Sequence, residues 1–268
     1  MQQWGREMSR MCAVLIAMSV LAGCSSPESE PVYGQMVVSY EDATTPAASQ
    51  GRSLMQKARV LDDMADYLNE YLKLPYPIEL VGAQCDEPNA FWSAADRRIT
   101  VCYEFADLFL TMFETNLDEN VTDPTKAAVN ATLATAYHEL GHALISIYDL
   151  PATGRLEDAA DQLSVYMWLV PDDNIKNDAP EVVEDFAEML KRLSTIRGDL
   201  VDEDFAGEHS LDLTRMYNLA CWVYGSDPIA NADVVARTGL PQARADRCPF
   251  EFQQIVKAWH SLLAPHVR

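Results

Sequence analysis

Two histidines four residues apart stand in the stretch H-E-L-G-H at positions 138–142, which has the pattern H-E-x-x-H. Residues 127–148 contain no proline and fit a helix, on which positions i and i+4 share a face. His138 and His142 can therefore reach one zinc ion, with Glu139 beside it as a base. A random chain of this composition would contain the pattern in about 0.6% of cases. A pair of surface histidines is the alternative, and we expect a metal site.

A catalytic zinc ion needs a third protein ligand and one open position for water. The next predicted helix begins near Leu156 and carries Glu157, Asp158 and Asp161 in its first turns. Glu157 and Asp161 share one face of this helix, whereas Asp158 lies about 100° away from Glu157. We expect Glu157 to bind the metal and Asp161 to accept a hydrogen bond from the free ring nitrogen of a histidine ligand. An acidic first turn that complements the helix dipole is the alternative.

The elements that must position these residues follow from the spacing of apolar side chains. Three- and four-residue spacing predicts helices over residues 53–74, 106–117, 124–148, 156–170, 180–196, 211–224 and 249–263. Two β-branched runs, 78–82 and 97–105, predict strands of a small sheet. Because the strands stay in the first half and helices fill the rest, we predict an α+β fold.

The N-terminal residues have a different character from the rest of the chain. Two arginines precede an apolar stretch that is too short to span a bilayer comfortably, which is typical of a signal peptide over residues 1–23. Residues 24–51 are rich in Ser, Pro, Thr and Glu, and this composition predicts a flexible tether. Residues 52–268 are then expected to form a single domain.

The end of the predicted signal peptide, Leu21-Ala22-Gly23-Cys24, resembles the lipobox of bacterial lipoproteins. The resemblance implies that Cys24 carries a lipid that anchors the protein to a membrane without spanning it. Ser25 and Ser26 do not suggest retention at the inner membrane, so we expect an exported lipoprotein on the periplasmic side of the envelope, anchored in the outer membrane. An ordinary signal peptide that happens to contain a cysteine is the alternative.

Charge and cysteine content limit the function further. A formal net charge of −21 repels phosphate backbones, so nucleic acid is not an expected partner. Outside the first 24 residues the cysteines are Cys85, Cys102, Cys221 and Cys248, and an even number in an oxidising compartment predicts two disulfides. We favour Cys85–Cys102 and Cys221–Cys248 because each closes a local loop. A cysteine zinc site is the alternative, but the tight Cys-x-x-Cys spacing is missing.

Several motifs carry a resemblance to known peptidases. H-E-x-x-H followed on the next helix by E-x-x-x-D resembles the gluzincin clan of zinc peptidases. The tetrapeptide N-A-F-W at positions 89–92 is identical to one on the substrate-binding edge strand of thermolysin, a gluzincin. The stretches "CDEPNAFW", "RITVCYE", "GRLEDAADQ" and "MYNLACWVYGSDP" are similar to a family of bacterial metallopeptidases, from about Arg52 to the end. The gap between His142 and Glu157 is shorter than in thermolysin. The resemblance implies a zincin-like fold.

This resemblance also implies roles for particular residues. Glu139 would be the general base of a zinc-dependent peptidase. His209 would donate to the oxyanion that forms during hydrolysis, with Tyr217 as a further catalytic group and Arg215 as a substrate-binding one. An exposed loop histidine is the alternative for His209, and as a third zinc ligand it ranks below Glu157.

The expected partners are one zinc ion per chain and a peptide or protein substrate. An edge strand that includes Asn89 and Ala90 would bind an extended peptide through main-chain hydrogen bonds. A zinc-binding or inactive lipoprotein that holds a peptide or an envelope partner is the rival function. The sequence leaves the oligomeric state open.

Overall fold

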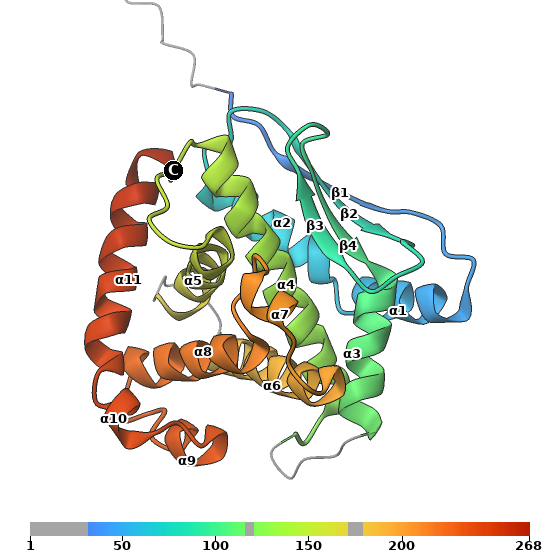
Figure 1. The fold of residues 1–268 in the computed structure, drawn as a ribbon. Coiled ribbons are helices and arrows are strands. Elements are labelled where there is room, and N and C mark those ends of the chain that lie inside the picture. The colour runs from blue at the N-terminus through green and yellow to red at the C-terminus, as the bar shows by residue number, and fades with distance from the viewer. Residues whose placement is uncertain (1–31, 116–120, 171–178) are drawn as a thin grey trace, which may run out of the picture. The chain divides into compact units, whose positions relative to one another are not determined.

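A four-stranded sheet with helices packed on it, and a larger helical part beside it, form the described part of the chain, in a computed structural model that describes residues 32–115, 121–170 and 179–268 (Figure 1). The predicted signal peptide and Cys24 lie outside these residues. From Tyr33 onward the chain forms one unit. No helix within the described ranges has the length and apolar character needed to cross a membrane.

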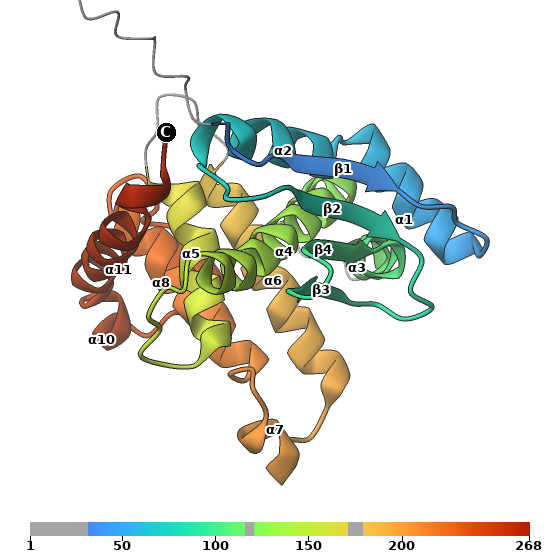
Figure 2. The same cartoon turned by 90° about the horizontal axis from the view of Figure 1, so that it is seen from above.

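The sheet is small and mixed. Its strands are β1 (Met36–Tyr40), β2 (Ile78–Ala83), β3 (Ala90–Ser93) and β4 (Arg98–Cys102). Figure 2 shows their order, β1-β2-β4-β3, in which β1, β2 and β4 are parallel and β3 is antiparallel to β4. Both predicted strands are present, although residues 103–105 of the second belong to the helix that follows β4, and β3 lies at an edge of the sheet as the resemblance implied. A parallel pair needs a crossover, which here consists of two helices between β1 and β2.

The predicted tether over residues 24–51 is wrong for the part that the structure describes, because β1 and the start of helix α1 (Pro46–Lys57) lie within it. The Thr45 side chain accepts a hydrogen bond from the Ala48 N–H at 3.2 Å, and Pro46 stands at the first helical position. Threonine and proline at these positions are typical of a helix start. Thr45 and Pro46, which contributed to the linker-like composition, therefore form the start of a helix, and the folded part begins before Arg52.

The single helix predicted over residues 53–74 is also wrong. The chain forms α1 and then α2 (Val60–Tyr71), which are separated at Arg59, a residue in the left-handed region with φ 52°. Gly51 lets α1 approach the chain at Tyr103, because a Cβ atom at Gly51 would lie 1.9 Å from the Tyr103 carbonyl oxygen. The break allows α2 to pack on β1 while α1 packs on another helix, α3.

The other helix predictions agree with the structure within a few residues. The helices are α3 (Tyr103–Thr115), α4 (Pro124–Ile147), α5 (Leu156–Leu169), α6 (Ala179–Arg197), α8 (Asp212–Ser226) and α11 (Cys248–Leu263). Residues 116–117 of the third predicted helix lie outside the described ranges. Four short helices were not expected, α7 (Asp202–Ala206), α9 (Val234–Thr238), α10 (Gln242–Ala245) and a final 3₁₀ turn (Ala264–His266). The α+β fold class is confirmed.

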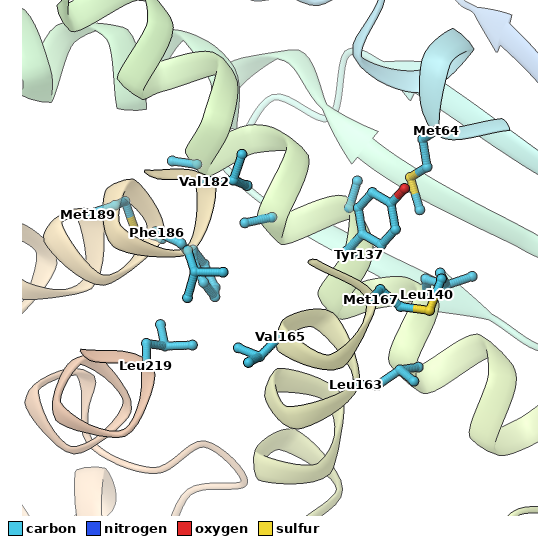
Figure 3. Close-up of a cluster of buried hydrophobic side chains, with 14 of the residues drawn as sticks. Met64, Tyr137, Leu140, Leu163, Val165, Met167, Val182, Phe186, Met189 and Leu219 are labelled. Atoms are coloured by element: carbon cyan, nitrogen blue, oxygen red, sulfur yellow. The ribbon is translucent and has the colours of Figure 1, made fainter. Parts of the chain in front are cut away.

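The helical core lies between α4, α5, α6 and α8 (Figure 3). Tyr137, Val165, Phe186 and Leu219 are buried there and come from these four helices in turn. α4 is buried on nearly all sides and also packs on β3 and β4. A helix that is buried all round occupies the centre of a protein, and this central helix carries the H-E-x-x-H residues.

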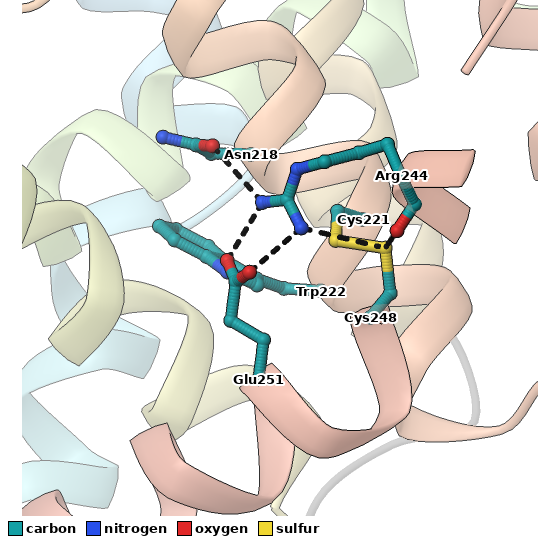
Figure 4. Close-up of a disulfide and its surroundings, with 6 residues drawn as sticks. All are labelled: Asn218, Cys221, Trp222, Arg244, Cys248 and Glu251. Atoms are coloured by element: carbon teal, nitrogen blue, oxygen red, sulfur yellow. Dashed lines mark hydrogen bonds and ion pairs between the residues drawn. A yellow bond between two sulfur atoms is a disulfide. The ribbon is translucent and has the colours of Figure 1, made fainter. Parts of the chain in front are cut away.

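Both predicted disulfides are present in the structure. Cys85–Cys102 ties the chain just after β2 to the end of β4, and Cys221–Cys248 joins α8 to α11. Figure 4 shows that Arg244 forms two ion-pair contacts with Glu251 beside the second disulfide, at 2.6 and 2.7 Å. The first disulfide fixes the chain next to the sheet edge, and the second fixes the C-terminal helix.

Candidate metal centre

The helix that carries the two histidines begins with a well-formed cap. The Asp123 side chain accepts a hydrogen bond from the Lys126 N–H at 3.0 Å, and Pro124 follows it. Further along α4, His138 is 4% exposed and Glu139 is 7% exposed. Polar groups at this depth are costly unless they have partners. The surroundings of the two side chains therefore decide what the site can do.

Three side chains place one ligand atom each around a common point. His138 Nε2 and His142 Nε2 are 3.2 Å apart, and Glu157 Oε2 lies 3.1 Å from the first and 3.3 Å from the second. Bonds of about 2.0–2.1 Å in tetrahedral geometry separate neighbouring ligand atoms by about 3.3 Å. His138, His142 and Glu157 could therefore hold one metal ion, as the sequence predicts.

Asp161 fixes the orientation of the first histidine. Its Oδ1 atom lies 2.8 Å from His138 Nδ1, and Arg215 donates to both carboxylate oxygens at 2.8 Å. Burial alone would raise the pKa of Asp161, but the charge and hydrogen bonds of Arg215, together with His138, hold it well below its usual range. An ionised Asp161 accepts a hydrogen bond from the Nδ1–H group of His138, which leaves the lone pair of His138 on Nε2.

The donor set fits a cation chemically as well as geometrically. With the proton on Nδ1, the Nε2 atom of His138 directs a lone pair toward Glu157 Oε2. Both atoms are then hydrogen-bond acceptors, so their contact at 3.1 Å needs a positive charge between them, from a proton or a metal ion. Burial would lower the pKa of His138, but Asp161 and Glu157 outweigh it and raise the pKa to about 9. The hydrogen bonds of the surrounding imidazoles overcome the effect of burial on Glu157 and lower its pKa. The cluster thus favours a bound proton or metal ion.

A glycine inside the motif allows the third ligand to approach. A Cβ atom at Gly141 would lie 2.7 Å from Ala160 Cα and 3.0 Å from Ala160 Cβ, so α4 and α5 pack at this point with no side chain between them. Glu157 is one turn before Ala160 on α5. The H-E-x-x-H pattern leaves this position free, so the sequence analysis gave Gly141 no role. The available signal was a glycine in a helix interior, which costs about 1 kcal/mol relative to alanine and needs a packing reason.

Glu139 lies next to the three ligands and faces the edge strand. Burial raises the pKa of Glu139, against the lowering effect of His138 and His142 and of a hydrogen bond from the Trp92 backbone N–H. A carboxylate with a raised pKa is suited to accept and release a proton near neutral pH. The structure thus places Glu139 in the same cleft as the three candidate ligands.

The metal-site residues open into a cleft of about 540 Å³. The edge strand β3 and the residue before it form one wall, with Asn89, Ala90 and Phe91 among the lining residues. An apolar wall from α3 and α6 consists of Phe105, Phe186, Met189, Leu190 and Leu193. The cleft therefore combines a strand edge that has no partner strand among the described residues, an apolar surface and the candidate metal ligands.

Of the remaining predicted residues, His209 and Arg215 line the cleft, whereas Tyr217 and Asp158 do not. His209, in the loop between α7 and α8, reaches the cluster, with Nε2 2.8 Å from Glu157 Oε2 and a side chain that is 58% exposed. Arg215 lines the cleft, but its guanidinium group is bonded to Asp161, so it supports a ligand instead of standing free for substrate. Tyr217 is partly buried against the core and is not among the cleft-lining residues. Asp158 is not part of the ligand group.

A family comparison agrees with this geometry. Residues 40–263 match the model of a protein family described as "Putative metallopeptidase". The chain belongs to this family. No curated protein and no solved structure matches the chain significantly. The matched region contains the two histidines, Glu157, the edge strand and His209. It therefore includes the whole candidate site.

Proposed function

We propose that the chain is a zinc-dependent peptidase. The observation that carries the proposal is the triangle of His138, His142 and Glu157, with the buried carboxylate of Glu139 beside it in an open cleft. Two imidazoles and one carboxylate are a ligand set of catalytic zinc sites, which keep the fourth position open. The family match and the resemblance to gluzincins support the same reaction class.

A zinc ion held by the three ligands would polarise the scissile carbonyl and bring the pKa of a water molecule toward neutrality. Glu139 accepts the proton of the attacking water and passes it to the leaving amine, a transfer that its raised pKa assists. The exposed His209 side chain contacts Glu157 at the cluster, and it donates a hydrogen bond to the oxyanion of the substrate. Asp161 and Arg215 keep His138 oriented throughout.

The substrate that fits this cleft is an extended peptide. β3 pairs only with β4 among the described strands, so its other edge is available for main-chain hydrogen bonds. Phe91 is 42% exposed on this strand, and the apolar wall of the cleft is suited to bulky apolar side chains. The Cys85–Cys102 disulfide lies beside the hairpin and limits its motion.

Glu139→Gln tests the proposal. The amide cannot accept the proton, so we expect hydrolysis of a mixed peptide library to fall by about 10²- to 10⁴-fold. Metal analysis should give about one zinc per chain for wild type and variant alike. Glu157→Ala should lose zinc affinity because one of three ligands is removed. A wild type that binds zinc and peptides but cleaves none would instead support the rival function, an inactive lipoprotein that holds a peptide.

We also propose that the protein is an exported lipoprotein anchored in the outer membrane through Cys24. Two disulfides in the described residues fit an oxidising compartment. Cys24→Ser should move the protein from the membrane fraction to the soluble periplasmic fraction and abolish labelling with a radioactive fatty acid. Unchanged fractionation and labelling would exclude the anchor.

A further inference from the structure

One arginine at the start of α5 holds the loop that bears His209. Arg155 Nη1 donates to the carbonyl oxygens of Gly207 at 3.0 Å, Glu208 at 3.4 Å and His209 at 2.9 Å. Its Nη2 atom lies 3.5 Å from the carbonyl oxygen of Phe205. The Arg155 guanidinium group thus contacts four carbonyl oxygens within five consecutive residues, 205–209. These carbonyls belong to the end of α7 and the loop after it, where a regular hydrogen-bond ladder is missing.

The same loop returns to the metal ligands through a side chain. Arg155 precedes Glu157 by two residues, and His209 places Nε2 2.8 Å from Glu157 Oε2. The loop is therefore fastened to the first turn of α5 at two points, one on its backbone and one on the His209 imidazole. The Arg155 contact fixes the position of the His209 backbone, and the Glu157 contact shows where the His209 imidazole lies.

Other contacts of this segment hold it to itself and to its flanking helices. Asp204 accepts from the Val201 N–H at 2.9 Å, and Arg197 forms ion pairs with Asp204 and Asp212, both at 3.2 Å. These bonds join the end of α6 to α7 and to the start of α8. They shape the segment but do not involve α5, whereas the Arg155 bonds do.

We propose that Arg155 is a positioning residue that holds the His209 imidazole at the metal cleft. The role of His209 in turnover rests on the proposed peptidase function, but the positioning itself does not. Arginine suits the task because its planar group presents five N–H donors in a fixed arrangement, while lysine offers a single ammonium centre. The loop carbonyl oxygens accept from several N–H donors of one planar group. Arginine can supply these donors together, and lysine cannot.

The first experiment measures whether Arg155 acts through His209. Arg155→Gln and His209→Gln should each lower kcat of the zinc-loaded enzyme by about 10- to 100-fold with a small change in KM, because each removes the donor from the transition state. The double variant should be no slower than the slower single one, since both remove the same interaction. Arg155→Lys should recover only part of the activity. Effects that multiply in the double variant would overturn the proposal.

Two controls separate positioning from damage to α5 or to the fold. Zinc affinity of Arg155→Gln should stay within about threefold of the wild type, because Glu157 keeps its place on the helix. Arg59→Gln removes a different exposed guanidinium, paired with Asp63 and Asp66 on α2, and should leave kcat unchanged. A large loss of zinc affinity in Arg155→Gln would assign Arg155 to the support of Glu157 instead.

A second readout works without peptide hydrolysis. Hydrogen exchange of backbone amides at residues 205–211 should accelerate at least about tenfold in Arg155→Gln, because the loop loses its link to α5. The NMR signal of the His209 ring should also shift toward that of a free histidine. If the wild type cleaves no peptide, the proposed function fails while these two measurements still decide the positioning role. Unchanged exchange and an unchanged ring signal would overturn it.

Discussion

The α4–α5 contact and the loop over residues 205–211 supply side chains to the same cleft, but different forces hold them. The ligands on α4 and α5 are set by close helix packing at Gly141 and by the buried pair of Asp161 and Arg215. The loop is linked to α5 by hydrogen bonds from the exposed Arg155, and the His209 side chain is 58% exposed.

Because different forces hold the two regions, we expect zinc affinity and turnover to depend on different residues. Ligands that are fixed by packing are already in place before the metal arrives, and such preorganisation favours affinity. A loop held by a few exposed hydrogen bonds opens at low free-energy cost, which suits a group that must adapt to substrate. Changes on the α4–α5 side should therefore alter zinc affinity, and changes in the loop should alter kcat.

Gly141→Ala should have the largest effect on the buried side. The new Cβ atom would lie 2.7 Å from Ala160 Cα, so the two helices must separate. Overpacking of this kind costs about 1–3 kcal/mol of unfolding free energy, and its relief by moving α5 would weaken zinc binding by up to roughly 100-fold. Urea unfolding and chelator competition measure the two quantities.

Gly154→Ala is the matched control, because a Cβ atom there has no neighbour within 4 Å. We expect a stability change below about 0.5 kcal/mol and no change in zinc affinity. Wild-type zinc affinity in Gly141→Ala would mean that the close approach of the helices does not determine where Glu157 lies, and the comparison would lose its main support.

Asp161→Asn should have the next largest effect. The amide keeps the shape of the side chain but removes the charge that orients His138 and pairs with Arg215. Loss of such a supporting carboxylate lowers metal affinity by about 10- to 100-fold. Asp158→Asn, three residues earlier on another face of α5, should change zinc affinity by less than about twofold. Competition with a fluorescent zinc chelator measures both variants, and equal effects would contradict the assigned role of Asp161.

Sequence reasoning succeeded where a repeating spacing decides the geometry. The i,i+4 pairs on two helices predicted both histidines, Glu157 and Asp161, because side chains four residues apart share a helix face. It failed where backbone conformation or contacts distant in sequence decide. The left-handed Arg59 divides one predicted helix, and nothing in the local pattern reveals it. Arg155 meets carbonyl groups more than 50 residues away, a contact that only the fold creates.

Asp185→Asn extends the comparison to pH, through a half-buried carboxylate on α6 that lines a pocket other than the cleft. Asp185 accepts a hydrogen bond from Asn130 Nδ2 at 2.7 Å between α6 and α4, and burial raises its pKa to about 6. Because the folded pKa exceeds the unfolded value, the folded state binds more protons, so this group makes the protein more stable as the pH falls. Between pH 7 and pH 5 the gain is about 1 kcal/mol. Asp185→Asn should abolish this gain. It should also raise the free energy of unfolding at pH 7, because the amide carries no charge that burial disfavours.

Asp204, the same residue type in the segment before the loop, provides the contrast. The hydrogen bond from the Val201 N–H lowers its pKa, so its contribution is present at neutral pH and is lost as the pH falls. The two aspartates should therefore give pH dependences of opposite sign. Urea unfolding of Asp185→Asn and Asp204→Asn at pH 5 and pH 7 measures both slopes. Slopes of the same sign would mean that the surroundings of these two aspartates do not shift their pKa values in opposite directions.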